Sequence, residues 1–284
     1  MTKKDIRLKG HEKFTLREGW LNKGIIGVKE DSKLFSGIKG ADKLGVGSNM
    51  VKSIRYWLQA FKLVDETKKD GTILSEFGKI VYENDIYFED MFTLWLLHSN
   101  IAKNKEKATT WYLFFNKCDA NEFTKDDLVE IFKKEIIKLI GTDDFSENSL
   151  KDDIDVLLNM YSKENINDDP EDKKNCPLSV LGLVKKEDAT YIKQQPEIRK
   201  INEWIVLYEL SCLFENEESI SIDTVATTLE NIYNLTKVTV NGFLDKLENA
   251  GYINVNRTAG LDVIYPLDIA KPIEVIEEYY KQHK

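Results

Sequence analysis

Residues 45–74 read GVGSNMVKSIRYWLQAFKLVDETKKDGTIL, and this stretch decides the fold. Behind its glycine turn, apolar residues recur at helical spacing, namely Met50, Ile54, Trp57, Leu58 and Phe61. This periodicity predicts an amphipathic helix over residues 48–61. We expect Ser48 to be its N-cap, because a serine hydroxyl can accept a free backbone N–H of the first turn. Asp70-Gly71, which lies between short β-type runs, then predicts a hairpin.

The residues upstream complete a recognisable order of elements. Residues 1–30 are expected to form a strand or loop and a short helix, and Ser32–Leu44 has weak helical periodicity. Short helix, turn, longer helix and hairpin is the order of a winged helix, in which the second helix enters the major groove of DNA. We therefore predict a winged-helix-like DNA-binding domain over residues 1–88. Its expected DNA-contacting residues are Arg17, Lys23, Lys43, Ser48, Asn49, Lys52, Arg55, Tyr56 and Gln59.

Residues 89–165 are predicted to form a helical middle domain. Two aromatic segments, Phe88–His98 and Trp111–Asn116, are expected to be buried helices. An amphipathic helix is predicted over residues 124–140, with Thr124 and Asp127 in a capping box. Residues 141–175 contain eleven acidic and four basic residues, which favours a linker with one helix near Leu150–Tyr161.

Residues 166–284 are predicted to form a second winged-helix-like domain. The expected helices are Ile201–Phe214, Ile222–Leu229 and Thr236–Ala250, followed by β-type runs on either side of residues 256–260. The third helix carries Asp245 and Glu248 as well as lysines, so this domain contacts either protein or DNA. The predicted class is therefore mainly α with small β-wings: winged helix-turn-helix units at both ends around a helical body.

The charge is unevenly distributed. Residues 1–62 carry a net charge of +8 and the remaining residues a net charge of −17. Such asymmetry indicates either a localised polyanion site or basic residues that solvate the surface. No apolar run is long enough for a membrane span, and the N-terminus lacks the apolar region of a signal peptide. Three widely spaced cysteines, Cys118, Cys176 and Cys212, favour reduced thiols in a cytoplasmic protein.

Several blocks of the sequence match one bacterial family. They are Arg17-Glu18-Gly19-Trp20-Leu21-x-Lys23-Gly24, the run from Leu44 to Trp57, Glu89-Asp90-x-x-Thr93-Leu94-Trp95-Leu96-Leu97-His98, Trp111 with Phe114-Phe115-Asn116, and Cys176-Pro177-Leu178-x-x-Leu181-Gly182-Leu183. In these blocks, which cover most of the chain, the sequence resembles the SspB-type proteins of bacterial DNA phosphorothioation systems, a phage-defence family of formerly unknown function. It departs from the family pattern at Thr15, where proline is common, and at Lys13.

The resemblance implies a role in replacing a non-bridging phosphate oxygen of DNA with sulfur. SspB-type proteins are described as DNA nickases. They are encoded beside a cysteine desulfurase, a phosphoadenosine-phosphosulfate-reductase-like ATP pyrophosphatase and an ATPase. The resemblance therefore implies DNA, the pyrophosphatase and the ATPase as partners. It supplies no catalytic residues that can be transferred to this sequence.

Metal-dependent nicking needs carboxylates that hold Mg²⁺ and a nearby base. His11 is a candidate general base and Glu12 a candidate metal ligand, while Arg17 and Lys23 are placed to clamp phosphate. In the alternative, Glu12 pairs with Arg17 and His11 caps a turn. Asp90 and His98 form a second candidate pair, and the alternative for His98 is a half-buried structural role. The glycine turn before Ser48 is a further candidate phosphate cradle.

Three functions are compatible with the sequence. The first is a Mg²⁺-dependent DNA nickase, although no nuclease signature identifies the metal ligands. The second is a non-catalytic DNA-binding adaptor, whose acidic body suits docking to basic partner proteins. The third is a winged-helix transcription regulator. A homodimer is compatible with each of them.

Overall fold

The computed structural model describes residues 6–37, 39–162, 176–260 and 262–283. These residues form helices and three small antiparallel sheets, which confirms the predicted mainly helical class with small β-structures. The chain divides into two compact units, Met1–Gln194 and Gln195–Lys284. This division is coarser than the three predicted domains, whose boundaries stay predictions. Within the described residues no helix is long and apolar enough to cross a membrane.

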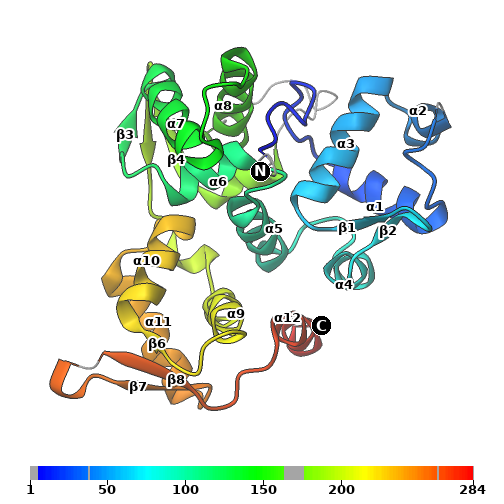
Figure 1. Cartoon of the computed structure of the whole chain (residues 1–284). Coiled ribbons are helices and arrows are strands. Elements are labelled where there is room, and N and C mark those ends of the chain that lie inside the picture. Colours follow the sequence, from blue (N-terminus) through cyan, green and yellow to red (C-terminus); the bar gives the residue numbers. More distant parts are fainter. Residues whose placement is uncertain (1–5, 38, 163–175, 261, 284) are drawn as a thin grey trace. The chain divides into compact units, whose positions relative to one another are not determined.

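The first unit holds helices α1 to α8 and strands β1 to β5 (Figure 1). Its α-helices are α1 (Trp20–Glu30), α2 (Lys39–Leu44), α3 (Ser48–Ala60), α4 (Glu76–Asn84), α5 (Met91–Lys103), α6 (Thr109–Asn116), α7 (Lys125–Ile140) and α8 (Glu147–Ser162). Its strands are β1 (Val64–Thr67), β2 (Gly71–Leu74), β3 (Glu122–Phe123), β4 (Val184–Glu187) and β5 (Thr190–Lys193), and a short 3-10 helix, η1 (Pro177–Leu181), precedes β4.

In the first half of this unit, α1 packs against α2, α3 and α4, beside the β1–β2 hairpin. The hairpin pairs Val64 with Leu74 and Thr67 with Gly71, as the Asp-Gly signal predicts. Gly71 has φ +79°, and a Cβ there would lie 2.4 Å from the Ser32 carbonyl oxygen, so this close approach requires glycine. The prediction that Ser48 is the N-cap of α3 is wrong by one residue. Gly47 is the N-cap of α3, and Ser48 is the first residue of the helix.

In the second half, α5 is buried from Phe92 to Ala102, which confirms an aromatic core helix. The predicted capping box of Thr124 and Asp127 starts α7. The predicted helix near Leu150–Tyr161 is present as α8. The linker prediction is wrong for these residues, because α8 buries a regular apolar face against α6, α7 and β4 despite its acidic composition. The rest of the predicted linker, residues 163–175, lies outside the described residues.

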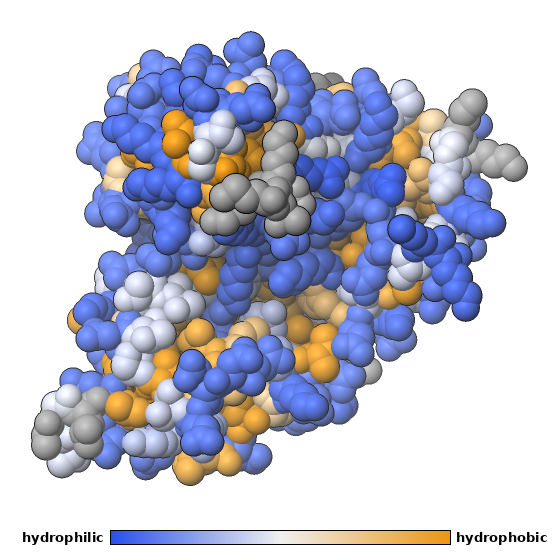
Figure 2. Space-filling view, viewed as in Figure 1, coloured by the Kyte–Doolittle hydropathy of each residue, from blue (hydrophilic) through white to orange (hydrophobic). Residues whose placement is uncertain are grey.

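The second unit has its own core. It contains η2 (Ile198–Lys200), α9 (Glu203–Phe214), β6 (Ile220–Ser221), α10 (Ile222–Tyr233), α11 (Lys237–Asn249), β7 (Ile253–Asn256), η3 (Thr258–Gly260), β8 (Val263–Pro266) and α12 (Pro272–Gln282). The strands form one antiparallel sheet in the order β6-β8-β7. The predicted three helices and hairpin are confirmed, whereas β6 and α12 were not predicted. Hydrophobic residues appear among the hydrophilic ones on the visible face of this unit (Figure 2), and Val238 is 83% exposed.

Candidate functional site

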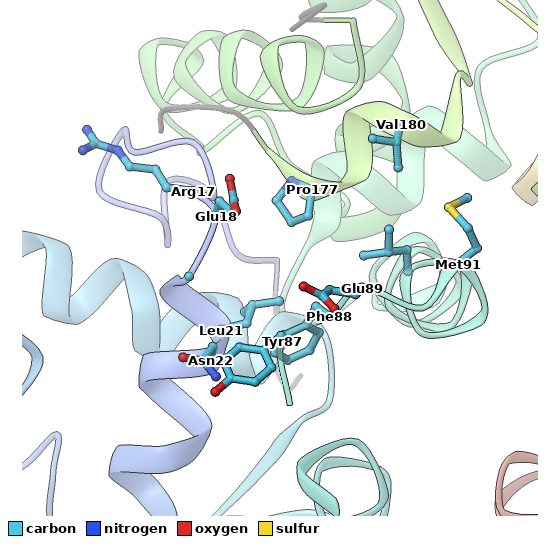
Figure 3. A pocket seen from close by; sticks show the side chains of 12 residues that line it. Arg17, Glu18, Leu21, Asn22, Tyr87, Phe88, Glu89, Met91, Pro177 and Val180 are labelled. Atoms are coloured by element: carbon cyan, nitrogen blue, oxygen red, sulfur yellow. The ribbon is translucent and has the colours of Figure 1, made fainter. Parts of the chain in front are cut away.

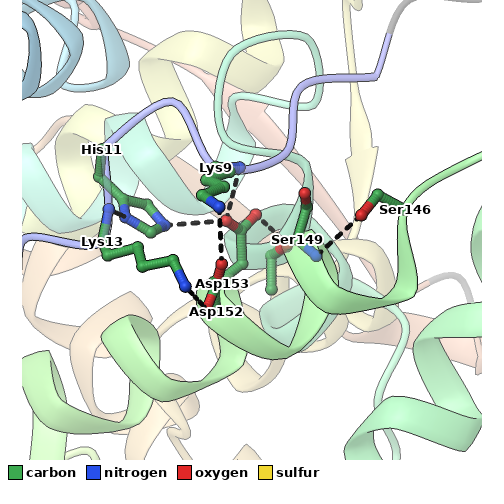
Figure 4. A network of polar contacts seen from close by, with 8 residues as sticks. Lys9, His11, Lys13, Ser146, Ser149, Asp152 and Asp153 are labelled. Atoms are coloured by element: carbon green, nitrogen blue, oxygen red, sulfur yellow. Dashed lines mark hydrogen bonds and ion pairs between the residues drawn. The ribbon is translucent and has the colours of Figure 1, made fainter.

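A buried contact between His11 and Asp153 fixes the N-terminal segment of the first unit (Figure 4). His11 Nε2 lies 2.8 Å from Asp153 Oδ1 on α8, and both side chains are almost completely buried. Asp153 also accepts hydrogen bonds from the Lys9 backbone N–H and from the Thr110 hydroxyl, each at 2.7 Å. The pair therefore joins residues 9–13 to α6 and α8.

The hydrogen bonds of His11 define its role. The Lys13 backbone N–H donates to His11 Nδ1 at 3.1 Å, so the ring proton lies on Nε2 and points at Asp153. Both ring nitrogens are occupied and the side chain has no exposed surface. This geometry suits a positioning residue and gives a DNA phosphate no access to the predicted general base. Glu12, the predicted metal ligand, is half-buried beside it in a left-handed turn with φ +51°.

Aromatic packing connects this pair to α3. The His11 ring stacks on Trp57 and meets the edges of Tyr56 and Trp111, each with 5.8 Å between ring centroids. A Cβ on Gly10 would lie 2.3 Å from the Tyr56 ring, so only glycine fits at this position beside the ring. Tyr56 is 1% exposed, which contradicts the prediction that it lies on the polar face of the helix. The buried side chains of α3, including Tyr56 and Trp57, thus anchor the helix in the core and fix the position of its exposed face.

Lysines 9 and 13 pair with a second carboxylate of α8. Their Nζ atoms lie 3.1 and 3.0 Å from the oxygens of Asp152. Burial raises the pKa of Asp152, but the hydrogen bonds from Lys13 and Lys9 outweigh burial, and the pKa lies below its ordinary value. Lys9 and Lys13, two cations of the basic N-terminal segment, therefore form ion pairs within the protein.

The exposed face of α3 carries Ser48, Asn49, Lys52 and Arg55. Lys52 Nζ donates to Asn49 Oδ1 at 3.2 Å. Arg55 Nε donates to Glu66 Oε1 on β1 at 2.5 Å. Burial raises the pKa of Glu66, but the hydrogen bond from Arg55 and its positive charge lower it by more. The pKa therefore lies below its ordinary value, and this carboxylate is ionised at neutral pH. Arg55 therefore joins the helix to the hairpin.

The other predicted DNA-binding residues lie in different surroundings. Gln59 is half-buried and accepts a hydrogen bond from Arg7 at 3.1 Å. Lys43 donates to Asp31 at 2.5 Å, and this hydrogen bond lowers the pKa of Asp31. Lys23 is exposed and its Nζ approaches the Leu44 carbonyl oxygen at 3.5 Å. These residues therefore do not form one continuous face with Lys52.

Sequence reasoning missed Lys68 and Lys69 at the tip of the β1–β2 hairpin. Both are exposed, and among the described residues neither takes part in an ion pair. The Asp-Gly turn that predicted the hairpin was the available signal, since lysines at its tip must face solvent. They add positive charge to the hairpin that packs beside α3.

The second candidate pair, Asp90 and His98, occupies two different environments. Asp90 is the N-cap of α5, where its carboxylate accepts from the Phe92 backbone N–H at 2.8 Å. His98 is fully buried, and its Nδ1 lies 2.8 Å from the Tyr161 hydroxyl. Rings of Trp95, Phe115 and Tyr161 surround it. The surroundings of His98 are those of a core histidine.

A pocket of about 590 Å³ opens on the first unit. Arg17, Glu18 and Leu21 line it from the start of α1, Glu89 and Leu94 from the start of α5, and Pro177 and Val180 from η1. These residues belong to three of the sequence blocks that carry the family resemblance. The carboxylates of Glu18 and Glu89 lie at the pocket, whereas the guanidinium of Arg17 points away from it (Figure 3) and lies 5.3 Å from the centre of the Trp20 ring. Arg17 is therefore not placed to clamp phosphate here.

A strained residue shapes the rim of this pocket. Phe88 is buried and has φ +58°, a conformation that costs a bulky L-residue about 1–3 kcal/mol. The next residue along the rim, Tyr87, is 71% exposed. Cys176 precedes Pro177 and is buried, and desolvation raises the pKa of its thiol to about 12. It is therefore an unreactive thiol beside the pocket.

The described residues do not assemble a protein metal centre. No group of three or more His, Cys, Asp or Glu side chains lies close enough to hold a metal ion within this part of the chain. Glu18 and Glu89 share the pocket, but they are two ligands at most. The metal ligands, which the sequence left unidentified, are not identified by this geometry.

The geometry defines a mainly helical protein with an exposed basic helix, a neighbouring hairpin that carries two lysines at its tip, and a separate acidic pocket. A family model described as a protein of unknown function, DUF4007, matches residues 8–280, and the chain belongs to this family. The crystal structure of SspB and the magnesium ion-bound crystal structure of SspB each match with a TM-score of 0.84 and 22% identity. Each match covers 97% of this chain and 87% of the other. The chain thus has the SspB fold, as the resemblance predicted. No curated protein matches the sequence.

Proposed function

We propose that this protein is the DNA-binding component of a DNA phosphorothioation defence system. The resemblance to SspB-type proteins supplies the system, and the shared fold over nearly the whole chain supports it. We assign DNA binding to the first unit, with α1, α2, α3 and the β1–β2 hairpin acting as a winged helix. In this assignment α3 enters the major groove and the hairpin contacts the backbone.

The observation that carries this assignment is the exposed face of α3 beside a lysine-tipped hairpin. Asn49 and Lys52 are side chains that donate to base edges and phosphates. Lys68 and Lys69 place two further exposed cations at the tip of the hairpin. The N-terminus of α3 begins at Gly47 with no side-chain cap, which leaves backbone N–H groups for a phosphate.

A mobility-shift titration with a 30-base-pair duplex over a series of salt concentrations tests DNA binding. We expect binding at low salt and a steep loss of affinity as salt rises, because each lysine–phosphate contact releases counterions. Absence of binding at low salt, or an affinity that does not change with salt, would contradict the proposal. Adding the ATP pyrophosphatase and ATPase of the same system tests whether these partners contribute to binding.

DNA nicking with Mg²⁺ is the second candidate function. It is favoured by the magnesium ion-bound structure of SspB, a protein of the same fold. Conversion of supercoiled plasmid to open circles, with Mg²⁺ and with a chelator, tests it directly. If Glu12→Ala and Asp90→Ala variants nick as well as the parent, these residues are not catalytic. If the parent does not nick with or without the partner proteins, the non-catalytic adaptor is the better account. A transcription regulator predicts sequence-specific binding instead.

A further inference from the structure

The pocket at the start of α1 and α5 is acidic where the proposed DNA interface is basic. Residues 83–90, of which Tyr87, Phe88 and Glu89 line the pocket, contain four acidic and no basic residues. Glu18 and Glu89 contribute their carboxylates, and the guanidinium of Arg17 points away from the pocket (Figure 3). A phosphate backbone would be repelled here, so this pocket is a poor site for DNA.

Glu89 is the exposed carboxylate with which this pocket can recognise a ligand. Its backbone N–H donates to Asp85 at 2.9 Å, which fixes the main chain. No ion pair or side-chain hydrogen bond of the Glu89 carboxylate occurs among the described residues. The position is therefore rigid in its backbone and open at its charged end.

The remaining walls of the pocket are apolar. Met91, Pro177 and Val180 line it, and Val180 is 37% exposed. Tyr87 also lines the pocket and has 71% of its surface exposed. A pocket with apolar walls, an exposed aromatic ring and carboxylates fits a long side chain that ends in a cation.

We propose that this pocket receives an arginine or lysine side chain from a basic segment of a partner protein. The aliphatic stem of that side chain packs against Pro177 and Val180, and its charged end donates to Glu89, with Glu18 on the same lining. Tyr87 offers its ring face to the cation. Charge complementarity with residues 83–90, which contain four acidic and no basic residues, favours such a partner. Arginine is also a frequent anchor of protein interfaces. The proposal does not depend on the proposed function, because it uses a different surface.

The test uses the full chain and two labelled, capped peptides of alternating glycine and arginine or glycine and citrulline. Fluorescence anisotropy measures their binding. We expect the arginine peptide to bind and the citrulline peptide, which has the same shape without the charge, to bind at least about tenfold more weakly. A Glu18→Gln/Glu89→Gln variant should weaken binding of the arginine peptide by about tenfold. Tyr87→Ala should weaken it by a smaller factor.

The control variant is Glu76→Gln/Glu122→Gln, which removes the same charge from exposed positions of the first unit outside the pocket. It should bind the arginine peptide within about twofold of the parent. Equal losses in both double variants would show non-specific attraction and overturn the proposal. Equal binding of the two peptides would overturn it as well. Displacement of the peptide by a thymidine oligonucleotide, with the same dependence on Glu89, would assign the pocket to nucleic acid.

Discussion

Two regions of this molecule share an order of elements and differ in surface charge. In the first unit, α3 precedes the β1–β2 hairpin. In the second unit, α11 precedes the β7–β8 hairpin. On the first, Lys52, Lys68 and Lys69 have no ion pair among the described residues. On the second, Lys237 pairs with Asp223 at 3.0 Å and Arg257 with Asp245 at 2.8 Å.

The difference teaches that helix order alone does not define a DNA-binding surface. Exposed ion pairs contribute little to stability, but they neutralise the charge that would attract phosphate. The second region also exposes Val238 at the start of α11, where a DNA-reading helix carries polar groups. This difference supports our proposal that the first region binds DNA, and it favours protein contact for the second.

The largest expected contrast between the units is in thiol reactivity. Burial raises the pKa of Cys176 in the first unit to about 12, while Cys212 in the second is part-exposed. At pH 8 the thiolate fraction of Cys176 is about a thousandfold below that of an ordinary cysteine. Iodoacetamide labelling followed by peptide mass spectrometry should therefore modify Cys212 long before Cys176. Similar rates in the native protein would show that the interior of the first unit opens readily.

Removing the carboxylate that holds residues 9–13 should have the largest effect on stability. Asp153→Ala leaves His11, the Lys9 N–H and the Thr110 hydroxyl without their acceptor. We expect a loss of about 3 kcal/mol in the free energy of unfolding, measured by urea titration. Asp155→Ala, the exposed neighbour that pairs with Lys125, should cost less than about 1 kcal/mol. Equal losses would contradict the anchoring role.

The second unit has its own buried polar contact, between the Tyr233 hydroxyl and Glu209 at 2.5 Å. Tyr233→Phe removes one donor to a buried carboxylate and should cost about 1–2 kcal/mol. Urea unfolding followed by tryptophan fluorescence measures this loss through Trp204, which lies in α9 with Glu209. An unchanged midpoint would mean that water or another group replaces the hydroxyl.

The smallest effect is expected for Asp152→Asn, with a pH dependence whose sign is defined. The folded protein holds the pKa of Asp152 below its ordinary value of 3.8. Its pairs with Lys9 and Lys13 therefore stabilise the fold fully above that value, and the contribution disappears as pH falls through the lowered pKa. The variant should lose about 0.5 kcal/mol at pH 7. The difference in urea midpoint from the parent should shrink as the pH falls below 3.8, and a constant difference would contradict the ion-pair account.

Much of the fold follows from local sequence signals. The α3 periodicity, the Asp70-Gly71 turn and the Thr124 capping box each act over a few residues, and each was predicted. Two features depend on distant partners and were missed. Strand β5 pairs with β3 and β4, across more than sixty residues of sequence in one case. The burial of α8 was also missed, because the sequence predicted this helix but its acidic composition favoured a linker.

The candidate site was harder to predict than the fold. Composition located the basic segment, but Lys9, Lys13 and Arg55 are paired with carboxylates that lie far along the chain or on the hairpin. His11 looked accessible because its neighbours are polar, and its burial results from α3 and α8 closing over it. The pocket was not predicted, since it forms where three separate sequence blocks meet.

The central claim is tested most directly by charge reversal on the two regions in parallel. Lys52→Glu/Lys69→Glu changes the first region and Lys237→Glu/Arg257→Glu the second, each with the same change in net charge. Mobility shifts on one duplex over a salt series measure both. We predict that the first variant loses at least about tenfold in affinity and reduces the salt slope by about two, while the second stays within about twofold of the parent. Equal losses, or a larger loss in the second variant, would contradict the assignment of DNA binding to α3 and its hairpin.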